Sequence, residues 1–203
     1  EVVDYLKEQY GDRFEYVAER DIFDYVYDGE ILRTLKGRKN SKKRNHINYF
    51  LSEYEGRFEY RLLGKADFDD CRQLLDDWTV NKEENNNIEE GVDDERLGIE
   101  KLFAHYDQVC DRLKIAGIYI DGKLEAFTMG ELLNNNMALI HIEKANPEIR
   151  GLYPYINQQF LVHEFPDVEF VNREEDMGHE GLRTAKESYH PEFMIKKYSS
   201  VFK

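Results

Sequence analysis

Two side chains that can exchange protons lie two residues apart in the segment ALIHIEK (138–144). This segment is predicted to be a strand, in which alternate side chains share a face. Ile140 and Ile142 are then expected on one face, with His141 and Glu143 on the other. An imidazole and a carboxylate in one cleft can deprotonate an incoming amine or polarise it through a bound water. The pattern predicts a general base, although a paired histidine and glutamate on a half-exposed sheet face would look the same.

A turn that could hold an anion follows at once, in the residues NPEIRGLYP (146–154). Pro154 suits the first position of a helix, Gly151 lets another backbone come close, and Arg150 adds a positive charge. The N–H groups at the start of a helix attract phosphate or carboxylate groups. The segment predicts a donor-binding turn, with an ordinary strand-to-helix connection as the alternative.

A polar segment, NREEDMGHEGLR (172–183), is the third candidate, and KESYHP (186–191) lies close behind it. Polar residues of both signs beside two glycines, after a buried strand, are typical of functional loops. Tyr189 could protonate a leaving group, or it could pack as an aromatic beneath the last strand. The other candidates in this segment are Asn172, Arg173, Glu175, Asp176 and Lys186.

The hydrophobic pattern predicts the elements that position these residues. A lead-in helix, a strand and a connector are expected over 1–30, helices at 41–56, 68–78 and 94–113, a strand at 58–62 and an exposed loop at 81–92. Three antiparallel strands are expected over 116–144, with a turn at Asp121-Gly122. A helix (154–164), a strand (168–172), a helix (180–188) and a strand (193–198) follow. This order predicts a layered α/β (α+β) domain with a mixed sheet, and a crevice where a helical crossover joins two strands.

The charge of the chain is negative overall but is reversed in one segment. The 203 residues suit one domain, and their net charge is −14. The segment RTLKGRKNSKKR (33–44) contains seven basic residues and no acidic one, so that the rest of the chain carries −21, seven below the total. An acidic protein repels a polyanion unless one surface reverses the field. Lys39, Lys42, Lys43 and Arg44 are candidates for that surface, unless the stretch is only a solvated helix start.

Cysteine content and hydropathy indicate the compartment. Cys71 and Cys110 lie in helical patterns, and neither a disulfide framework nor a zinc site is predicted from their spacing. No apolar run of about 18 residues predicts a membrane span, and the opening residues, Glu1 to Tyr5, do not have the pattern of a signal peptide. Because the chain lacks an initiator Met, we expect a piece of a longer protein. It is expected to be cytoplasmic, or peripheral to a membrane, and without a metal.

Four segments resemble a bacterial family related to the C-terminal domain of phosphatidylglycerol lysyltransferases. They are LKGRKNSKKRNHINYF (35–50), IHIEKA (140–145), RGLYPYINQQF (150–160) and NREEDMGHEGLRTAKESYHP (172–191). The order of elements from Phe58 to Tyr198 also resembles the GNAT acyltransferase fold. The resemblance implies a three-layer domain with an antiparallel meander, splayed central strands and flanking helices. It further implies a connector over 1–30 from an upstream GNAT-like lobe in cis, and a GNAT-like acyltransferase domain over 31–203.

The same resemblance implies a function. The lysyltransferases and the Fem-type peptidoglycan enzymes move an amino acid from aminoacyl-tRNA to an amine or hydroxyl. An acyl- or aminoacyltransferase is therefore implied, with no tightly bound cofactor, aminoacyl-tRNA or acyl-CoA as co-substrate, and a small-molecule, lipid-headgroup or peptide acceptor. His141, Glu143 and Tyr189 would be catalytic. The donor would contact Arg150, Gly151, Tyr153, Asn172, Arg173 and Lys186, and the acceptor or a polyanion would contact Lys39, Lys42, Lys43, Arg44, Glu175 and Asp176.

One departure from the GNAT pattern favours the aminoacyl-tRNA branch. The phosphate-binding turn of GNAT enzymes reads Gln/Arg-x-x-Gly-x-Gly/Ala, whereas here Glu148 holds the first place and Tyr153 the last. Coenzyme A is therefore the less favoured donor. A non-catalytic module, with its groove blocked by Tyr153 or Phe127, is an alternative, and a nucleic-acid binder led by residues 33–44 is another.

Overall fold

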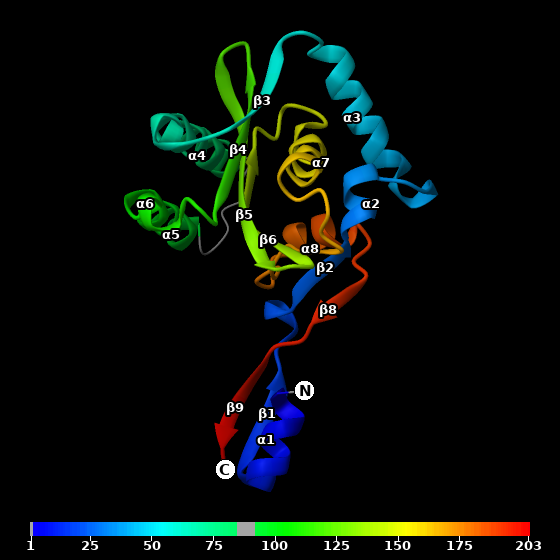
Figure 1. The fold of residues 1–203 in the computed structure, drawn as a ribbon, viewed down its shortest axis with the longest axis vertical. Coiled ribbons are helices and arrows are strands. Elements are labelled where there is room, and N and C mark those ends of the chain that lie inside the picture. Colours follow the sequence, from blue (N-terminus) through cyan, green and yellow to red (C-terminus); the bar gives the residue numbers. More distant parts are fainter. Residues whose placement is uncertain (1, 85–91) are drawn as a thin grey trace. The chain divides into compact units, whose positions relative to one another are not determined.

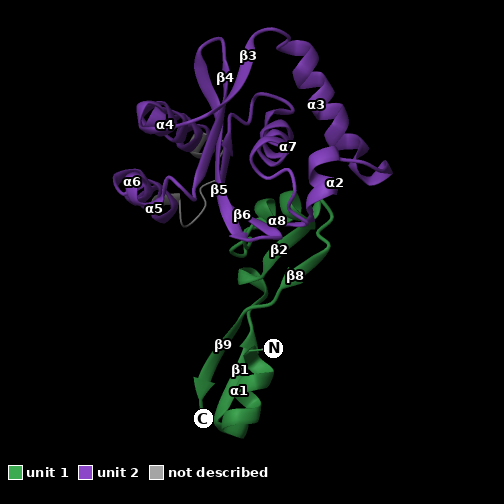
Figure 2. Ribbon diagram, viewed as in Figure 1, with its two compact units in different colours: residues 1–27, 172–203 green, residues 28–171 purple. Residues whose placement is uncertain are grey.

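The computed structural model describes residues 2–84 and 92–203, which belong to two compact units (Figure 2). The smaller unit joins residues 1–27 to residues 172–203, and the larger unit is the continuous segment 28–171. The expected connector over 1–30, with an upstream lobe before it, stays a prediction.

The larger unit is built on an antiparallel meander. β3 (Phe58–Leu62), β4 (Lys114–Ile120), β5 (Lys123–Asn134) and β6 (Met137–Ala145) each pair with the next strand in the chain. Asp121 and Gly122, between β4 and β5, have φ values of 49° and 85°. Positive φ at both central residues is the conformation of a type I′ hairpin turn, which matches the twist of the flanking strands. The predicted meander is confirmed.

Helices cover both faces of this sheet (Figure 1). On one face the rings of Phe68 and Phe103 stack at 4.0 Å, and the core beneath them includes the buried side chains of Phe127 and Met129. The opposite face is covered by a long central helix, against which two further helices pack. The helices on the first face are α4 (Phe68–Glu84), α5 (Val92–Ala104) and α6 (Tyr106–Val109). The central helix on the opposite face is α7 (Leu152–Glu164), and the two helices that pack against it are α2 (Gly29–Thr34) and α3 (Ser41–Glu53). The expected layered α/β fold is confirmed.

Strand β6 continues beyond its neighbour β7 (Phe170–Asn172). The N–H groups of Glu169 and Phe170 donate to the carbonyl of Asn136, at 3.0 and 2.9 Å, just before β6 begins. β7 has three residues, which span about 10 Å, whereas β6 has nine. Because α7 crosses between them, the two strands have the connection typical of a parallel pair. The outer half of β6, residues 141–145, therefore extends past the end of β7, as expected of splayed strands.

The smaller unit contains two antiparallel strand pairs, two α-helices and short 3-10 helices at 11–13 and 20–22. β1 (Phe14–Ala18) pairs with β9 (Tyr198–Phe202), and β2 (Asp24–Asp28) pairs with β8 (Phe193–Ile195). The helices are α1 (Val2–Tyr10) and α8 (Glu180–Glu187). The backbone of Tyr25 donates to the carbonyl of Glu174 and accepts from the N–H of Arg173, which ties β2 to the polar segment that follows β7.

Several expected boundaries are corrected. The helix expected over 94–113 is two helices, and the strand expected over 193–198 is two strands. Pro154 is the third residue of α7 rather than the first, which is tolerated because no N–H group of the first turn has an intrahelical acceptor. α2 was not expected, although Asp28 caps it by accepting from the N–H of Ile31 at 2.8 Å. In the expected loop over 81–92, α4 continues to Glu84, and residues 85–91 lie outside the described residues.

Candidate active site

A bulge interrupts the alternation of side chains along β6. Met129 of β5 lies opposite Ile142, whereas the next residue, Gly130, lies opposite Ile140, so that His141 is an extra residue. Ile142 packs against the core beneath α4 and α5. Ile140 lies over Gly130 on the side of α7. The expectation that Ile140 and Ile142 share a face is wrong, because alternation holds only in a strand without a bulge.

His141 and Glu143 consequently have partners from different elements. The Nε2 atom of His141 lies 3.4 Å from Oε1 of Glu131 in β5, and Nη2 of Arg112 lies 3.3 Å from Oε2 of the same carboxylate. Glu143 accepts a hydrogen bond of 2.8 Å from Nδ2 of Asn157 in α7. The structure thus places the partner of His141 in β5 and the partner of Glu143 in α7. Their catalytic role stays a prediction.

Tyr153 occupies the end of the outer half of β6. Its hydroxyl accepts from the indole N–H of Trp78 in α4 at 3.0 Å and from the backbone N–H of Ala145. Burial raises the pKa of Tyr153 to about 12. Nζ of Lys144 lies 3.7 Å from the centroid of the Trp78 ring and 2.7 Å from Oε1 of Glu95 in α5. An aromatic and charged cluster therefore lies where the phosphate turn of a GNAT enzyme was expected.

Sequence reasoning missed three members of this region, Trp78, Lys144 and Asn157. Asn157 could have been found, because it lies four residues after Tyr153 and so shares its helical face. Trp78 comes from a helix 75 residues before Tyr153, and no local spacing connects the two.

Gly151 and Arg150 contact the neighbouring helix α3. Gly151 precedes α7 with a φ of 90°, and a Cβ atom there would lie 2.1 Å from the carbonyl oxygen of His46. The guanidinium of Arg150 lies 4.7 Å from the centroid of the Tyr49 ring. The close backbone approach that Gly151 was expected to allow is therefore made by α3. Contact of these residues with a donor stays a prediction.

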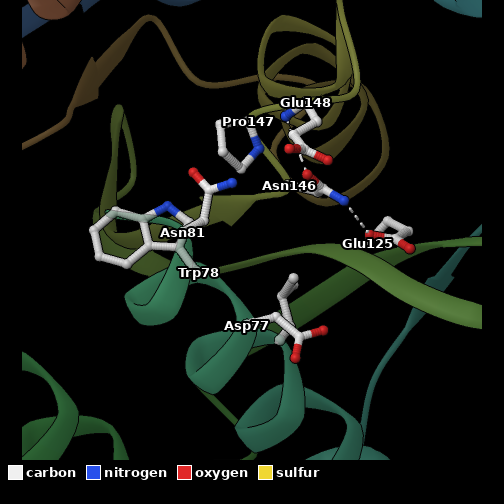
Figure 3. A pocket seen from close by; sticks show the side chains of 8 residues that line it. Asp77, Trp78, Asn81, Glu125, Asn146, Pro147 and Glu148 are labelled. Carbon is white, nitrogen blue, oxygen red and sulfur yellow. Dashed lines mark hydrogen bonds between the residues drawn. The ribbon is translucent and has the colours of Figure 1, made fainter. Parts of the chain in front are cut away.

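A pocket of about 140 Å³ opens between α4 and the loop that joins β6 to α7 (Figure 3). Asn146 shapes the loop, because its Nδ2 donates to Glu125 at 2.9 Å and its Oδ1 accepts from the N–H of Glu148 at 3.0 Å. On the opposite wall, the carboxylate of Asp77 accepts from Nζ of Lys123 at 2.8 Å. The lining residues, which sequence reasoning did not group together, are Leu74, Asp77, Trp78, Asn81, Glu125, Asn146, Pro147 and Glu148.

Part of the basic segment 33–44 is bonded to the chain itself. Nη1 of Arg33 donates to the carbonyls of Phe165 and Val168, both at 3.0 Å, and Arg44 donates to the carbonyls of Leu35 and Gly37. Arg44 thereby fixes the chain before α3, and its contact with a polyanion stays a prediction. We call the remaining group the basic surface; it comprises Lys39, Lys42 and Arg150, which are exposed, and Lys43 and His46, which are half-buried. Burial and then the charges of Arg150, Lys42 and Lys43 lower the pKa of His46, which shows that these groups lie together.

In the smaller unit, Asp176 is the centre of an ion-pair network. Its carboxylate has no exposed surface and accepts from Tyr25 at 2.6 Å, Arg183 at 2.9 Å and Arg20 at 3.1 Å. Burial alone would raise the pKa of Asp176, but the hydrogen bonds from Arg183 and Tyr25 outweigh it and hold the pKa well below its usual range. Asp176 therefore has partners within the unit.

The other predicted residues of this unit are also held by neighbours. Lys186 donates to the carbonyl of Arg173 at 2.6 Å and to that of Glu175, and Asn172 donates to Asp24 at 3.1 Å. The guanidinium of Arg173 lies 4.8 Å from the ring centroid of Tyr189, which is 6% exposed. Tyr189 is thus a buried, packed aromatic, which was the alternative to its role as an acid. Its role as an acid, and the donor or acceptor contacts of the others, stay predictions.

Known proteins resemble this chain over nearly its whole length. The model of the family described as "Phosphatidylglycerol lysyltransferase, C-terminal" matches residues 1–201. This chain belongs to that family. A conserved protein of unknown function from Bacteroides thetaiotaomicron is 34% identical, with a TM-score of 0.90 over 99% of this chain and 66% of that one. An uncharacterized protein of Mycoplasmoides gallisepticum is 28% identical over 86% of this chain and 54% of its own length.

More distant structures share the fold alone. L-PGS from Bacillus licheniformis has a TM-score of 0.61 at 15% identity, over 98% of this chain and 64% of that one. A tandem GNAT protein from the clavulanic acid biosynthesis pathway has a TM-score of 0.50 at 11% identity, over 98% and 58%. The GNAT-like fold of this member of the phosphatidylglycerol lysyltransferase C-terminal family is thereby confirmed. This chain spans about half of the length of the Mycoplasmoides relative and about two thirds of the length of the Bacteroides protein.

Two further properties of the described residues bear on function. Within residues 2–84 and 92–203, no helix combines the length and the apolar character that crossing a membrane requires. In the same part of the chain, no three His, Cys, Asp or Glu side chains are placed to hold a metal ion.

Proposed function

We propose that this chain transfers an acyl or aminoacyl group to an amine or hydroxyl acceptor, with its reaction centre beside the outer half of β6. The match of residues 1–201 to the phosphatidylglycerol lysyltransferase C-terminal family carries the proposal. The extension of β6 past β7 supports it, because the edge of a strand offers backbone N–H groups to a substrate carbonyl.

Glu143 is the base in this proposal. Its carboxylate accepts a hydrogen bond from Asn157, which holds it in one orientation beside β6. The acceptor's N–H or O–H proton passes to Glu143 as its nitrogen or oxygen attacks the acyl carbonyl carbon. When the tetrahedral intermediate collapses, the bond from that carbon to the leaving oxygen breaks, and Glu143 returns the proton to this oxygen. His141, paired with Glu131, lies at the bulge and is the second candidate for the base.

Aminoacyl-tRNA is the donor that the electrostatics favour. The basic surface lies beside the first turn of α7 and could contact the phosphates of an RNA chain. On the α4 side of the same turn, Asp77, Glu125 and Glu148 line the pocket, where their negative charges oppose the pyrophosphate of coenzyme A. The charges beside α3 thus favour the binding of RNA phosphates, and those beside α4 disfavour the binding of a pyrophosphate.

The donor is tested by supplying the purified protein with tRNA charged with labelled amino acids or with labelled acetyl coenzyme A. The acceptors are ethanolamine and vesicles of phosphatidylglycerol. We expect loss of label from tRNA, with the label recovered on an acceptor, and no consumption of acetyl coenzyme A. Turnover of acetyl coenzyme A alone would contradict the proposed donor, and turnover of neither donor would contradict the proposed function.

The position of Tyr153 favours a second function, that of a non-catalytic binding module. The Tyr153 hydroxyl accepts from the N–H of Ala145, a backbone donor at the edge of β6 that a transferred carbonyl could otherwise use. In that case the protein would bind charged tRNA and leave its ester bond intact. Equal rates of label loss with and without protein, together with saturable binding of the tRNA, would establish this second function.

A further inference from the structure

The pocket between α4 and the β6–α7 loop is not used by the transfer proposed at β6. On one side, α4 contributes the Trp78 indole and the Asp77 carboxylate to the lining. On the other side, the β6–α7 loop contributes Asn146, Pro147 and Glu148 (Figure 3). Ligand pockets for nucleotides and similar molecules measure about 300–1,000 Å³. At about 140 Å³ this pocket suits a small group at the end of a substrate.

The charge of the pocket selects a cation. Asp77, Glu125 and Glu148 contribute three carboxylates, and Lys123 forms ion pairs with the first two. Nζ of Lys123 lies 2.8 Å from Asp77 and 3.7 Å from Glu125, and its side chain is 53% exposed. An ammonium group of the chain itself therefore rests at the rim, and the described residues that line the pocket include three carboxylates and no cationic side chain.

The shape of the pocket favours an organic cation over a metal ion. Leu74, Pro147 and Trp78 supply apolar surface next to the carboxylates. Such a mixture suits an alkyl chain that ends in an ammonium group, which can bond to a carboxylate and lie against an aromatic ring. Within the described ranges 2–84 and 92–203, no three carboxylate, imidazole or thiol groups are placed as metal ligands.

We propose that this pocket binds the protonated primary amine of a substrate, with Glu125 and Asp77 bonding the ammonium group and Trp78 contacting its alkyl chain. This deepens the proposed transfer function by naming a cationic amine as part of a substrate. The binding itself requires no turnover. Each proposal can therefore fail without the other, since one is tested by ligand binding and the other by transfer of label.

Binding can be followed directly, because Trp78 is the single tryptophan of the chain and lies in the pocket wall. The purified protein is titrated at low salt with 1,4-diaminobutane, and in parallel with the neutral 1,4-butanediol. We expect a saturable change in tryptophan emission with the diamine, which weakens as salt is added, and none with the diol. A response of equal size to both compounds, or no response to the diamine, would overturn the proposal.

Variants locate the binding. Glu125→Gln keeps an oxygen acceptor for Asn146 and removes the charge, so the dissociation constant of the diamine should rise about tenfold or more. Lys123→Met removes the competing ammonium and should tighten binding. Glu59→Gln, on the exposed face of β3, is the matched control and should bind as the unchanged protein does. If Glu125→Gln retains its circular-dichroism spectrum and binds the diamine with unchanged affinity, the pocket is not the site.

Discussion

At the scale of single residues, buried polar atoms hold the end of β6 in place. The Tyr153 hydroxyl accepts from Trp78 and from the backbone of Ala145, and its phenol stays neutral because burial raises its pKa to about 12. Tyr153→Phe removes this acceptor from two buried donors. We expect the free energy of unfolding to fall by about 1–3 kcal/mol in urea titrations. Tyr49→Phe, at a ring 44% exposed, is the control and should change it by less than about 0.5 kcal/mol. A Tyr153→Phe protein of unchanged stability would show that the hydroxyl does not hold this end.

Lys186 makes the stability of the smaller unit depend on pH. Burial, and then the charge of Arg173, lowers its pKa from 10.5 to about 8. Between these values the unfolded chain binds the proton and the folded chain does not, so stability rises as pH increases from about 8 to 10.5, by at most about 3 kcal/mol. Lys186→Met should lack this rise when unfolding is measured at pH 7.5 and 10. Parallel pH profiles for the two proteins would contradict the assignment.

At the scale of elements, the contact of α3 with the start of α7 depends on Gly151. In Gly151→Ala the new Cβ would meet the carbonyl oxygen of His46 at 2.1 Å, at a φ of 90° that side chains rarely adopt. Strain and overpacking together should lower the free energy of unfolding by about 3 kcal/mol or more. Gly56→Ala has a φ of 71° but no heavy atom within 4 Å, and should cost about 1 kcal/mol. Equal losses would mean that the approach of α3 is not tight.

The elements themselves were largely predictable, since they follow from local pattern. The meander, its Asp121-Gly122 turn and the crossover helix were all expected from hydrophobic period and turn residues. The bulge at His141 was not, because nothing in the alternation of ALIHIEK distinguishes a regular strand from one with an extra residue. With that one-residue shift, His141 has a partner in β5 and Glu143 has one in α7, which strict alternation along the strand did not predict.

At the scale of the whole molecule, the net charge is −14, so most of the surface repels RNA. The basic surface is where we expect RNA phosphates to bind. In Lys42→Gln/Lys43→Gln, the slope of the logarithm of tRNA affinity against the logarithm of salt concentration should become shallower by about 1.5, because each phosphate contact contributes about 0.7–0.9. Filter binding at salt concentrations from about 50 to 200 mM measures it. The control is Lys65→Gln/Lys101→Gln, at exposed positions elsewhere. An unchanged slope in the first variant would remove the basic surface from the tRNA contact.

The site as a whole was less predictable than the fold because its residues come from distant segments. The pocket joins residues 74–81, Glu125 and residues 146–148, and Tyr153 meets Trp78 across 75 positions. A sequence pattern reports neighbours along a helix or strand, whereas these contacts depend on how α4 packs against the sheet. Even so, the basic segment was recognised from the sequence, and the structure adds that Arg33 and Arg44 bond to carbonyls of the chain and that Lys36 pairs with Glu30.

The most direct test of the central claim compares Glu143→Gln with Glu169→Gln in the transfer of a labelled amino acid from tRNA to an acceptor. The amide introduced by Glu143→Gln would still accept from Asn157 but could not take a proton, and Glu169 is an exposed carboxylate just before β7. We expect the rate of Glu143→Gln to fall about 100-fold or more, with an unchanged melting temperature, and that of Glu169→Gln to equal the wild type. A Glu143→Gln protein that transfers at the wild-type rate would contradict the account.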